Sequence, residues 1–252
     1  MLSLFTAGVV SALFFRLSPG EILAALASEE TRFALRLSLM TSIASISLAL
    51  ILGVPTGYFL ARTSFPGKAI LETFLDLPLV ITPLIAGVGL LFLFGQNMLG
   101  PRLEEWGITI LFTPWGAVLA QTFVACPIVM RSSRAAFERV GPRYEWAAAT
   151  LGLGPSQVFF RISLPLARQG ILAGTVLGWT RAMGEFGATL MVAGAIRFKT
   201  ETLPIAVYLN ISSGELGTAL SCAWVLMATG FVLLLALRWI GQGPRPETLP
   251  SR

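Results

Sequence analysis

The chain has 252 residues, of which 55% are hydrophobic and 12% are charged, and its mean hydropathy is +0.77. Ordinary soluble domains carry about 25% charged residues. One soluble core could not bury this much apolar surface, whereas a bilayer could, so the composition predicts an all-α polytopic membrane protein. The net charge of +5 does not indicate a nucleic-acid partner, because the basic residues are distributed among loops between apolar runs.

Apolar runs that suit membrane spans recur along the chain. A crossing helix needs about 20 mostly apolar residues, and the runs that reach or approach this length are 37–60, 70–94, 115–130, 170–196 and 219–240. A shorter run, 2–15, has neither the basic start nor the cleavage site of a signal peptide. The sequence predicts five transmembrane helices, or six if residues 2–15 also cross.

Basic residues predict how these helices are oriented, since cytoplasmic loops carry an excess of Lys and Arg. Alternate loops form two sets, and one set holds nearly twice as many basic residues as the other. The richer set includes the loop at about 132–168 and the tail after Arg238. We therefore expect this loop and the C-terminus on the cytoplasmic side of the cell membrane.

Two prolines interrupt the run 70–94. Pro78 and Pro83 are followed closely by Gly87 and Gly89. Proline breaks a helix because it lacks an N–H and its ring clashes with the preceding turn. Broken helices at membrane depth usually line a cavity. The sequence therefore predicts a helix break here that borders a path through the protein.

The loop 132–168 contains two informative runs, EWAAATLG from Glu145 to Gly152 and ISLP from Ile162 to Pro165. Small residues followed by a glycine predict a short helix that Gly152 closes with a turn. Pro165 predicts the first turn of a second helix. Ala147 and Ala148 would let another protein approach closely, although an amphipathic loop without a partner is the alternative.

Two ionisable residues lie within the apolar run 170–196. Arg181 and Glu185 are four residues apart, which would place them on one face of a helix. Each costs roughly 2.5–3.5 kcal/mol in hydrocarbon on insertion scales, so we expect them to face protein or water and to pair. The sequence leaves open whether this pair is structural or belongs to a transport path.

The loop motif resembles the EAA signature of permease subunits in ATP-binding-cassette (ABC) importers. One departure is that the family glutamate directly precedes the two alanines, where this chain has Trp146 and places Glu145 one position earlier. The resemblance implies a coupling helix seated in a groove of a cytoplasmic ATPase subunit. The residues that it assigns to ATPase coupling are Glu145, Ala147, Ala148, Gly152, Ile162, Leu164 and Pro165.

Other runs are similar to permeases for molybdate, tungstate and sulfate, and most of all to the molybdate branch. They are RAMGEFGAT from Arg181, SFPGK from Ser64, DLPLV from Asp76 and FTPWGAVLA from Phe112. This likeness implies the type I ABC importer permease fold, with residues 1–252 as one permease domain into which the loop at about 132–168 is inserted. The translocation path or gate that it implies includes Pro83, Gly87, Arg181, Gly184, Glu185 and Gly187.

The resemblance also implies partners: a second copy of the chain in a homodimer, two cytoplasmic ATPase subunits, and an extracytoplasmic oxyanion-binding protein. The chain has no GxxxxGK[ST] phosphate loop, so ATP and Mg would be bound by the ATPase partner and not by this subunit, which is not itself an enzyme. With no histidine, and with Cys126 and Cys222 inside apolar runs, we expect no cofactor or metal on this chain.

Two other functions compete with the molybdate reading. A sulfate or thiosulfate ABC permease shares the GEFG run, and affinity for the dianion should reside in the binding protein, since a path that held it tightly would not release it. The permease sequence therefore does not separate molybdate from tungstate or sulfate. An ATP-independent secondary transporter would need intramembrane carboxylates and internal repeats, and only Glu185 is a deeply placed acid.

Overall fold

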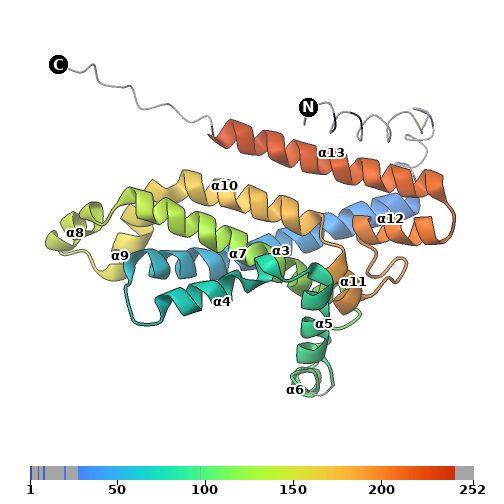
Figure 1. Ribbon diagram of the computed structural model, residues 1–252, viewed down its shortest axis with the longest axis horizontal. Helices are drawn as coiled ribbons and strands as arrows, with labels where there is room; N and C mark the ends of the chain where they lie inside the picture. Colours follow the sequence, from blue (N-terminus) through green and yellow to red (C-terminus); the bar gives the residue numbers. More distant parts are fainter. Residues whose placement is uncertain (2–4, 6–7, 9–19, 21–27, 97, 242–252) are drawn as a thin grey trace. The chain divides into compact units, whose positions relative to one another are not determined.

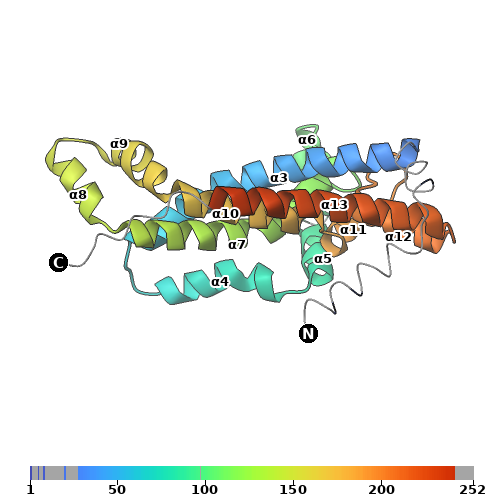
Figure 2. The same ribbon diagram turned by 90° about the horizontal axis from the view of Figure 1, so that it is seen from above.

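The computed structural model describes residues 28–96 and 98–241, together with the single positions 1, 5, 8 and 20. The described part is helical and contains no strand (Figures 1 and 2). Its elements are α3 (Glu29–Arg62), α4 (Lys68–Val80), α5 (Pro83–Phe94), α6 (Gly100–Glu105), α7 (Pro114–Val140), α8 (Arg143–Thr150), α9 (Pro155–Val158), the π-helix η1 (Phe159–Ser163), α10 (Leu164–Met183), α11 (Gly187–Ala193), α12 (Leu203–Ser212) and α13 (Leu216–Gly241). The run 2–15 lies outside the described residues apart from positions 5 and 8.

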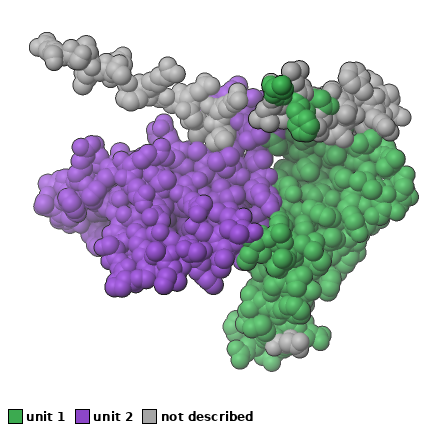
Figure 3. All heavy atoms as spheres, viewed as in Figure 1, with its two compact units in different colours: residues 1–44, 81–121, 183–230 green, residues 45–80, 122–182, 231–252 purple. Residues whose placement is uncertain are grey.

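Two compact units share the chain, and each is built from segments that are distant in sequence (Figure 3). Unit 1 contains Met1–Ala44, Ile81–Gln121 and Met183–Gly230, and unit 2 contains Ser45–Val80, Thr122–Ala182 and Phe231–Arg252. The expectation of a single permease domain over residues 1–252 stays a prediction.

Unit 2 is built around close contacts among α3, α7 and α10. Its core is formed by Ile46, Ala49, Val54, Ala125, Val129, Ala136, Phe137, Ala167, Ile171 and Ala182. A Cβ on Gly57 of α3 would lie 2.8 Å from the Met130 carbonyl oxygen of α7, and one on Gly170 of α10 would lie 2.6 Å from the Ala136 Cβ. Glycine at these positions lets helix backbones approach, as membrane helices commonly do.

In the same unit, α4 is held to α7 by ion pairs and buries none of its own residues. Arg131 Nε and Nη2 bond the two oxygens of Asp76, both at 2.7 Å, and Arg134 Nη1 lies 2.8 Å from Glu72 Oε1. The predicted break in the run 70–94 is confirmed, because α4 ends at Val80 and α5 begins at Pro83.

Unit 1 contains a second apolar cluster, formed by Ala34, Leu203, Ala206, Cys222 and Val225 of α3, α12 and α13. The Ser38 hydroxyl of α3 accepts a bond from the Leu203 N–H at 2.7 Å, which fixes the start of α12. Cys222 is buried, Cys126 is half-buried, and both are free thiols.

Among the described residues, two helical segments are long and apolar enough to cross a membrane by length and composition. They are α3 and the Leu216–Ala236 part of α13, and a third results if α4 and α5 form one broken span. The helices α7 and α10 occupy the other predicted runs. The run 170–196 was predicted as one span, but it is interrupted between Met183 of α10 and Gly187 of α11.

Candidate functional site

The segment from Arg143 to Ser163, which we call the α8–η1 segment, connects α7 to α10 and lies beyond their ends in both views (Figures 1 and 2). The predicted short helix, turn and second helical piece are confirmed. After α8, Gly152 adopts a φ of +84°. Its N–H bonds the Ala149 carbonyl at 3.0 Å and the Leu153 N–H bonds the Ala148 carbonyl at 3.2 Å, the Schellman pattern that ends a helix.

The second helical piece contains a π-helical turn, η1, before α10 begins at Leu164 with Pro165 in its first turn. Single π-helical turns are rare and frequently occur at functional sites. The ring of Phe159 in this turn packs edge-on to Tyr58 of α3, with centroids 4.8 Å apart. The same turn buries Ser163, whose hydroxyl is directed to Glu145.

Glu145 is the centre of a polar cluster in unit 2, at the end that the basic residues predict to be cytoplasmic. Arg62 Nε lies 2.9 Å from each of its two oxygens, and Arg62 Nη2 lies 2.9 Å from Oε1. Ser163 donates to Oε1 at 2.6 Å and Tyr58 donates to Oε2 at 3.3 Å. The Glu145 side chain is 12% exposed. This carboxylate is therefore satisfied within its own chain.

Opposing influences act on the pKa of the Glu145 carboxyl. Burial, the largest single influence, raises it, but hydrogen bonds from Arg62 and Ser163 and the charge of Arg62 together outweigh burial. The net effect is a pKa below the ordinary value of a glutamate. Glu145 is thus held as a carboxylate.

The predicted coupling residues divide between two faces of the segment. Ala148 is buried, and Glu145, Ile162 and Leu164 are half-buried, whereas Ala147, Gly152 and Pro165 are exposed. The outer face also carries large apolar side chains: Tyr144, Trp146, Leu151 and Phe160. The structure therefore does not bring the predicted set together on one surface.

The predicted gate residues are partly brought together in unit 1. A Cβ on Gly187, at the start of α11, would lie 3.1 Å from the Leu84 nitrogen and 3.3 Å from the Pro83 Cβ. Gly87 of α5 lies against Ala188 of α11. Pro83, Gly87 and Gly187 thus lie at one crossing of two short helices, beside the break at Gly184.

The prediction that Arg181 and Glu185 share one helix face is wrong. The helix α10 ends at Met183, so the two residues do not lie on one continuous helix. Glu185 is buried, and its Oε1 accepts the Ala188 N–H at 2.9 Å, which caps the first turn of α11. Gly184 and this capping bond explain the break between α10 and α11, because the Glu185 carboxylate stabilises the first turn of α11.

Sequence reasoning missed Arg62, Tyr58 and Ser163 as partners of Glu145. Arg62 ends an apolar run, where its position indicates only a basic loop, and Ser163 lies inside the ISLP run without a distinctive pattern. The Arg62–Glu145 separation of 83 residues is invisible to local periodicity. The one available signal is the position of Arg62, a basic residue at the end of the apolar run 37–60.

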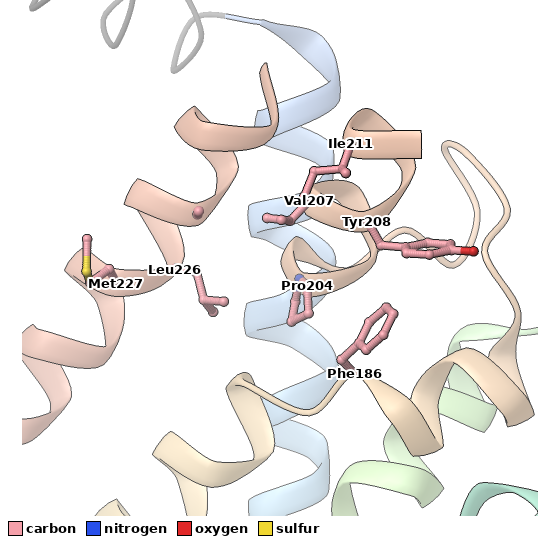
Figure 4. Close-up of a pocket in the computed structure, with 8 residues that line it drawn as sticks. Phe186, Pro204, Val207, Tyr208, Ile211, Leu226 and Met227 are labelled. Carbon is pink, nitrogen blue, oxygen red and sulfur yellow. The ribbon is translucent and has the colours of Figure 1, made fainter. Parts of the chain in front are cut away.

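An apolar cavity of about 430 Å³ lies in unit 1 beside α12 and α13 (Figure 4). Phe186, Pro204, Val207, Tyr208, Leu226 and Met227 are among its lining residues. None of the described residues that line it carries a carboxylate or a basic group. In the part of the chain that the structure describes, no group of three or more His, Cys, Asp or Glu residues could hold a metal ion.

The described residues thus combine helices long and apolar enough to cross a membrane, breaks in two of the apolar runs and an exposed short-helix segment between α7 and α10. Residues 53–246 match the family described as "Binding-protein-dependent transport system inner membrane component", and the chain belongs to that family. It is thus a permease subunit of an ABC importer.

Named relatives cover most of the chain. It is 41% identical over 213 residues to the molybdenum transport system permease protein ModB of Escherichia coli (strain K12), covering 83% of this chain and 93% of that protein. ModB of Mycobacterium tuberculosis (strain ATCC 25618 / H37Rv) is 38% identical over 93% of this chain and 89% of its own length. The sulfate transport system permease protein CysW of Synechocystis sp. (strain ATCC 27184 / PCC 6803 / Kazusa) is 39% identical over 80% of this chain and 74% of its own length.

Solved structures share the fold. A chain of a bacterial alginate ABC transporter, in complex with an alginate pentasaccharide-bound periplasmic protein, superimposes with a TM-score of 0.73 at 15% identity, covering 96% of this chain and 88% of that one. A chain of the MetNI methionine ABC transporter, in an inward-facing conformation, gives a TM-score of 0.62 at 18% identity, covering 83% and 94%. The expected type I ABC importer permease fold is confirmed.

Proposed function

We propose that this chain is the permease of an ATP-driven importer for molybdate or tungstate. The observation that carries the substrate assignment is the 38–41% identity to proteins named as molybdenum permeases, over most of the length of both partners. The subunit would form the path through the bilayer, and two copies would enclose it. An extracytoplasmic oxyanion-binding protein would deliver the anion to the outer mouth.

We assign energy coupling to the α8–η1 segment. It stands beyond α7 and α10, and exposed apolar side chains lie on its outer face. Two cytoplasmic ATPase subunits, which would bind ATP and Mg, would each hold one such segment. Closure of the ATPases on ATP would then switch the permease between inward-facing and outward-facing states. This chain would contribute no catalytic residue and bind no cofactor.

The crossing of α5 and α11 supports a gate near Pro83, Gly87, Gly184, Glu185 and Gly187. Where a helix within the membrane is interrupted, backbone groups lose their partners in the helix. Such interruptions are tolerated where they line a cavity. Arg181, in the last turn of α10, is assigned to the same path. The dianion would pass without a tight site in the permease, because strong binding would prevent release.

Reconstitution with ATPase subunits and binding protein tests the function. Binding protein loaded with molybdate should stimulate ATP hydrolysis in proteoliposomes more than binding protein loaded with sulfate. Equal stimulation by the two anions would remove the substrate assignment. If the chain purifies without ATPase subunits and a proton gradient alone drives uptake, the result would favour a secondary transporter.

A sulfate permease is the second candidate, and the 39% identity to CysW favours keeping it. The same reconstitution separates the two candidates. A system for sulfate should show stimulation and uptake with sulfate-loaded protein, and tungstate should not compete. A molybdate system should accept tungstate as an equivalent load.

A further inference from the structure

The half-buried Glu145 carboxylate is bonded to Arg62, Tyr58 and Ser163 of its own chain. We propose that Glu145 is a positioning residue that ties α8 and η1 to the end of α3, and that Trp146 and Leu151 make the contact with the ATPase partner. This inference rests on the proposed function, because it concerns the partner that the α8–η1 segment would meet.

Both oxygens of Glu145 already have donors. Oε1 accepts from Arg62 and Ser163 at 2.9 and 2.6 Å, and Oε2 accepts from Arg62 and Tyr58 at 2.9 and 3.3 Å. A partner that bound this carboxylate would have to displace Arg62 and leave a partly buried cation without its counter-charge, which is costly. Glu145 is therefore placed for contact within its own chain.

The polar cluster joins four elements. Arg62, the last residue of α3, also donates from Nη2 to the Phe137 carbonyl of α7 at 3.0 Å. Tyr58, one turn earlier in α3, packs its ring against Phe137 of α7 and Phe159 of η1, with centroids 5.1 and 4.8 Å away. Hydrogen bonds between charged groups are short and directional. A push on α8 must move α3 as well or break these bonds, so the cluster transmits displacement to a membrane-spanning helix.

The outer face offers a different chemistry. Trp146 is 68% exposed and Leu151 is 81% exposed. Trp146 stands directly before the two alanines, where the EAA signature has its glutamate. Tryptophan is enriched among the few residues that dominate binding energy at protein interfaces. An apolar pocket on the ATPase would be the complement to these two exposed side chains.

The test compares Glu145→Gln with Trp146→Ala in the complete complex. Glu145→Gln should co-purify with the ATPase as the unaltered protein does, while its stimulation by loaded binding protein falls about tenfold, a size typical of coupling between sites. Trp146→Ala should lower co-purification itself. Glu138→Gln is the matched control, because Glu138 is a half-exposed carboxylate on α7 that pairs with Arg134 outside the cluster, and it should behave like the unaltered protein in both assays.

A second measurement uses the full chain without partners. Backbone amides of the α8–η1 segment should exchange hydrogen several-fold faster in Glu145→Gln than in Glu138→Gln, because the link to α3 is lost. Unchanged exchange, or loss of ATPase co-purification in Glu145→Gln, would overturn the inference. If the unaltered complex is stimulated and Glu145→Gln is stimulated equally, only this inference fails. If the unaltered chain neither binds an ATPase nor responds to loaded binding protein, the proposed function fails first.

Discussion

Gly87 of α5 lies directly against Ala188 of α11. A Cβ added to Gly87 would be 2.8 Å from the Ala188 Cα and 2.7 Å from the Met191 Cβ. Such distances leave no room for a side chain, so the two helices cross at backbone contact. Both helices begin where a predicted apolar run is interrupted. The crossing therefore fixes the C-terminal parts of these two runs, α5 and α11, to each other inside unit 1.

Gly87→Val should destabilise this crossing. Overpacking of a tight contact typically costs about 1–3 kcal/mol, and the apparent melting temperature in detergent should fall accordingly. The matched control is Gly89→Val, since Gly89 lies on the same helix with nothing within 4 Å of an added Cβ. Equal apparent melting temperatures for Gly87→Val and Gly89→Val would contradict the contact.

The turn at Gly152 gives a second prediction. Because its φ is +84°, a residue with a Cβ is strained there even though the surrounding space is open. Gly152→Ala should cost about 1–2 kcal/mol locally and speed hydrogen exchange at the end of α8. Gly154→Ala is the control, since Gly154 has a φ of −73° and equally open space. Equal exchange in the two variants would rule out strain at the turn.

Local chemistry explains which parts of the fold were readable from sequence. Pro83 predicts the start of α5 because its ring excludes a preceding helical turn, and Gly152 predicts a helix end because it tolerates a left-handed backbone. The break before Gly187 was not predicted. It depends on the hydrogen bond from the Ala188 N–H to the Glu185 carboxylate. The four-residue spacing of Arg181 and Glu185 instead predicts one continuous helix.

The candidate site was readable only in part for a related reason. The sequence located the α8–η1 segment, because its small residues, glycine and proline act over a few positions. It did not reveal that Glu145 faces inward, since that orientation depends on Arg62, which is far away along the chain. The pairing of distant polar groups is decided by how α3 and α7 pack, and no local pattern encodes it.

Orientation in the membrane can be tested with introduced cysteines. The count of basic residues predicts Thr150 inside and Lys199 outside, and both positions are exposed. In intact cells of the native orientation, with Cys126 and Cys222 replaced by Ala, an impermeant thiol reagent should label Lys199→Cys. It should label Thr150→Cys only after lysis. Labelling of Thr150→Cys in intact cells would place the α8–η1 segment outside and remove the proposed coupling.

Glu201, in the loop between α11 and α12, gives the final prediction. Its side chain is fully buried, Oε2 accepts the Phe198 N–H at 3.0 Å, and Oε1 has no donor among the described residues. Burial first, and then the neighbouring Glu30 carboxylate, raise its pKa to about 7, against the opposing effects of the Phe198 N–H and the charge of Arg197. The folded protein therefore retains a proton on Glu201 at pH values where the unfolded chain, with a pKa of 4.5, has released it.

The sign of the pH effect follows from this difference. Below a pH of about 4.5 both the folded and the unfolded state bind the proton, and the contribution of Glu201 to stability is at its highest. As the pH rises toward about 7, the free energy of unfolding falls by roughly 1.4 kcal/mol per unit of pKa difference. The apparent melting temperature should therefore decrease between about pH 5 and about pH 7, and Glu201→Gln should flatten that slope. Glu215→Gln, at an exposed position nearby in sequence, should retain the slope. A slope that persists in Glu201→Gln would show that another group releases the proton, because Gln keeps the shape of Glu201 but cannot ionise.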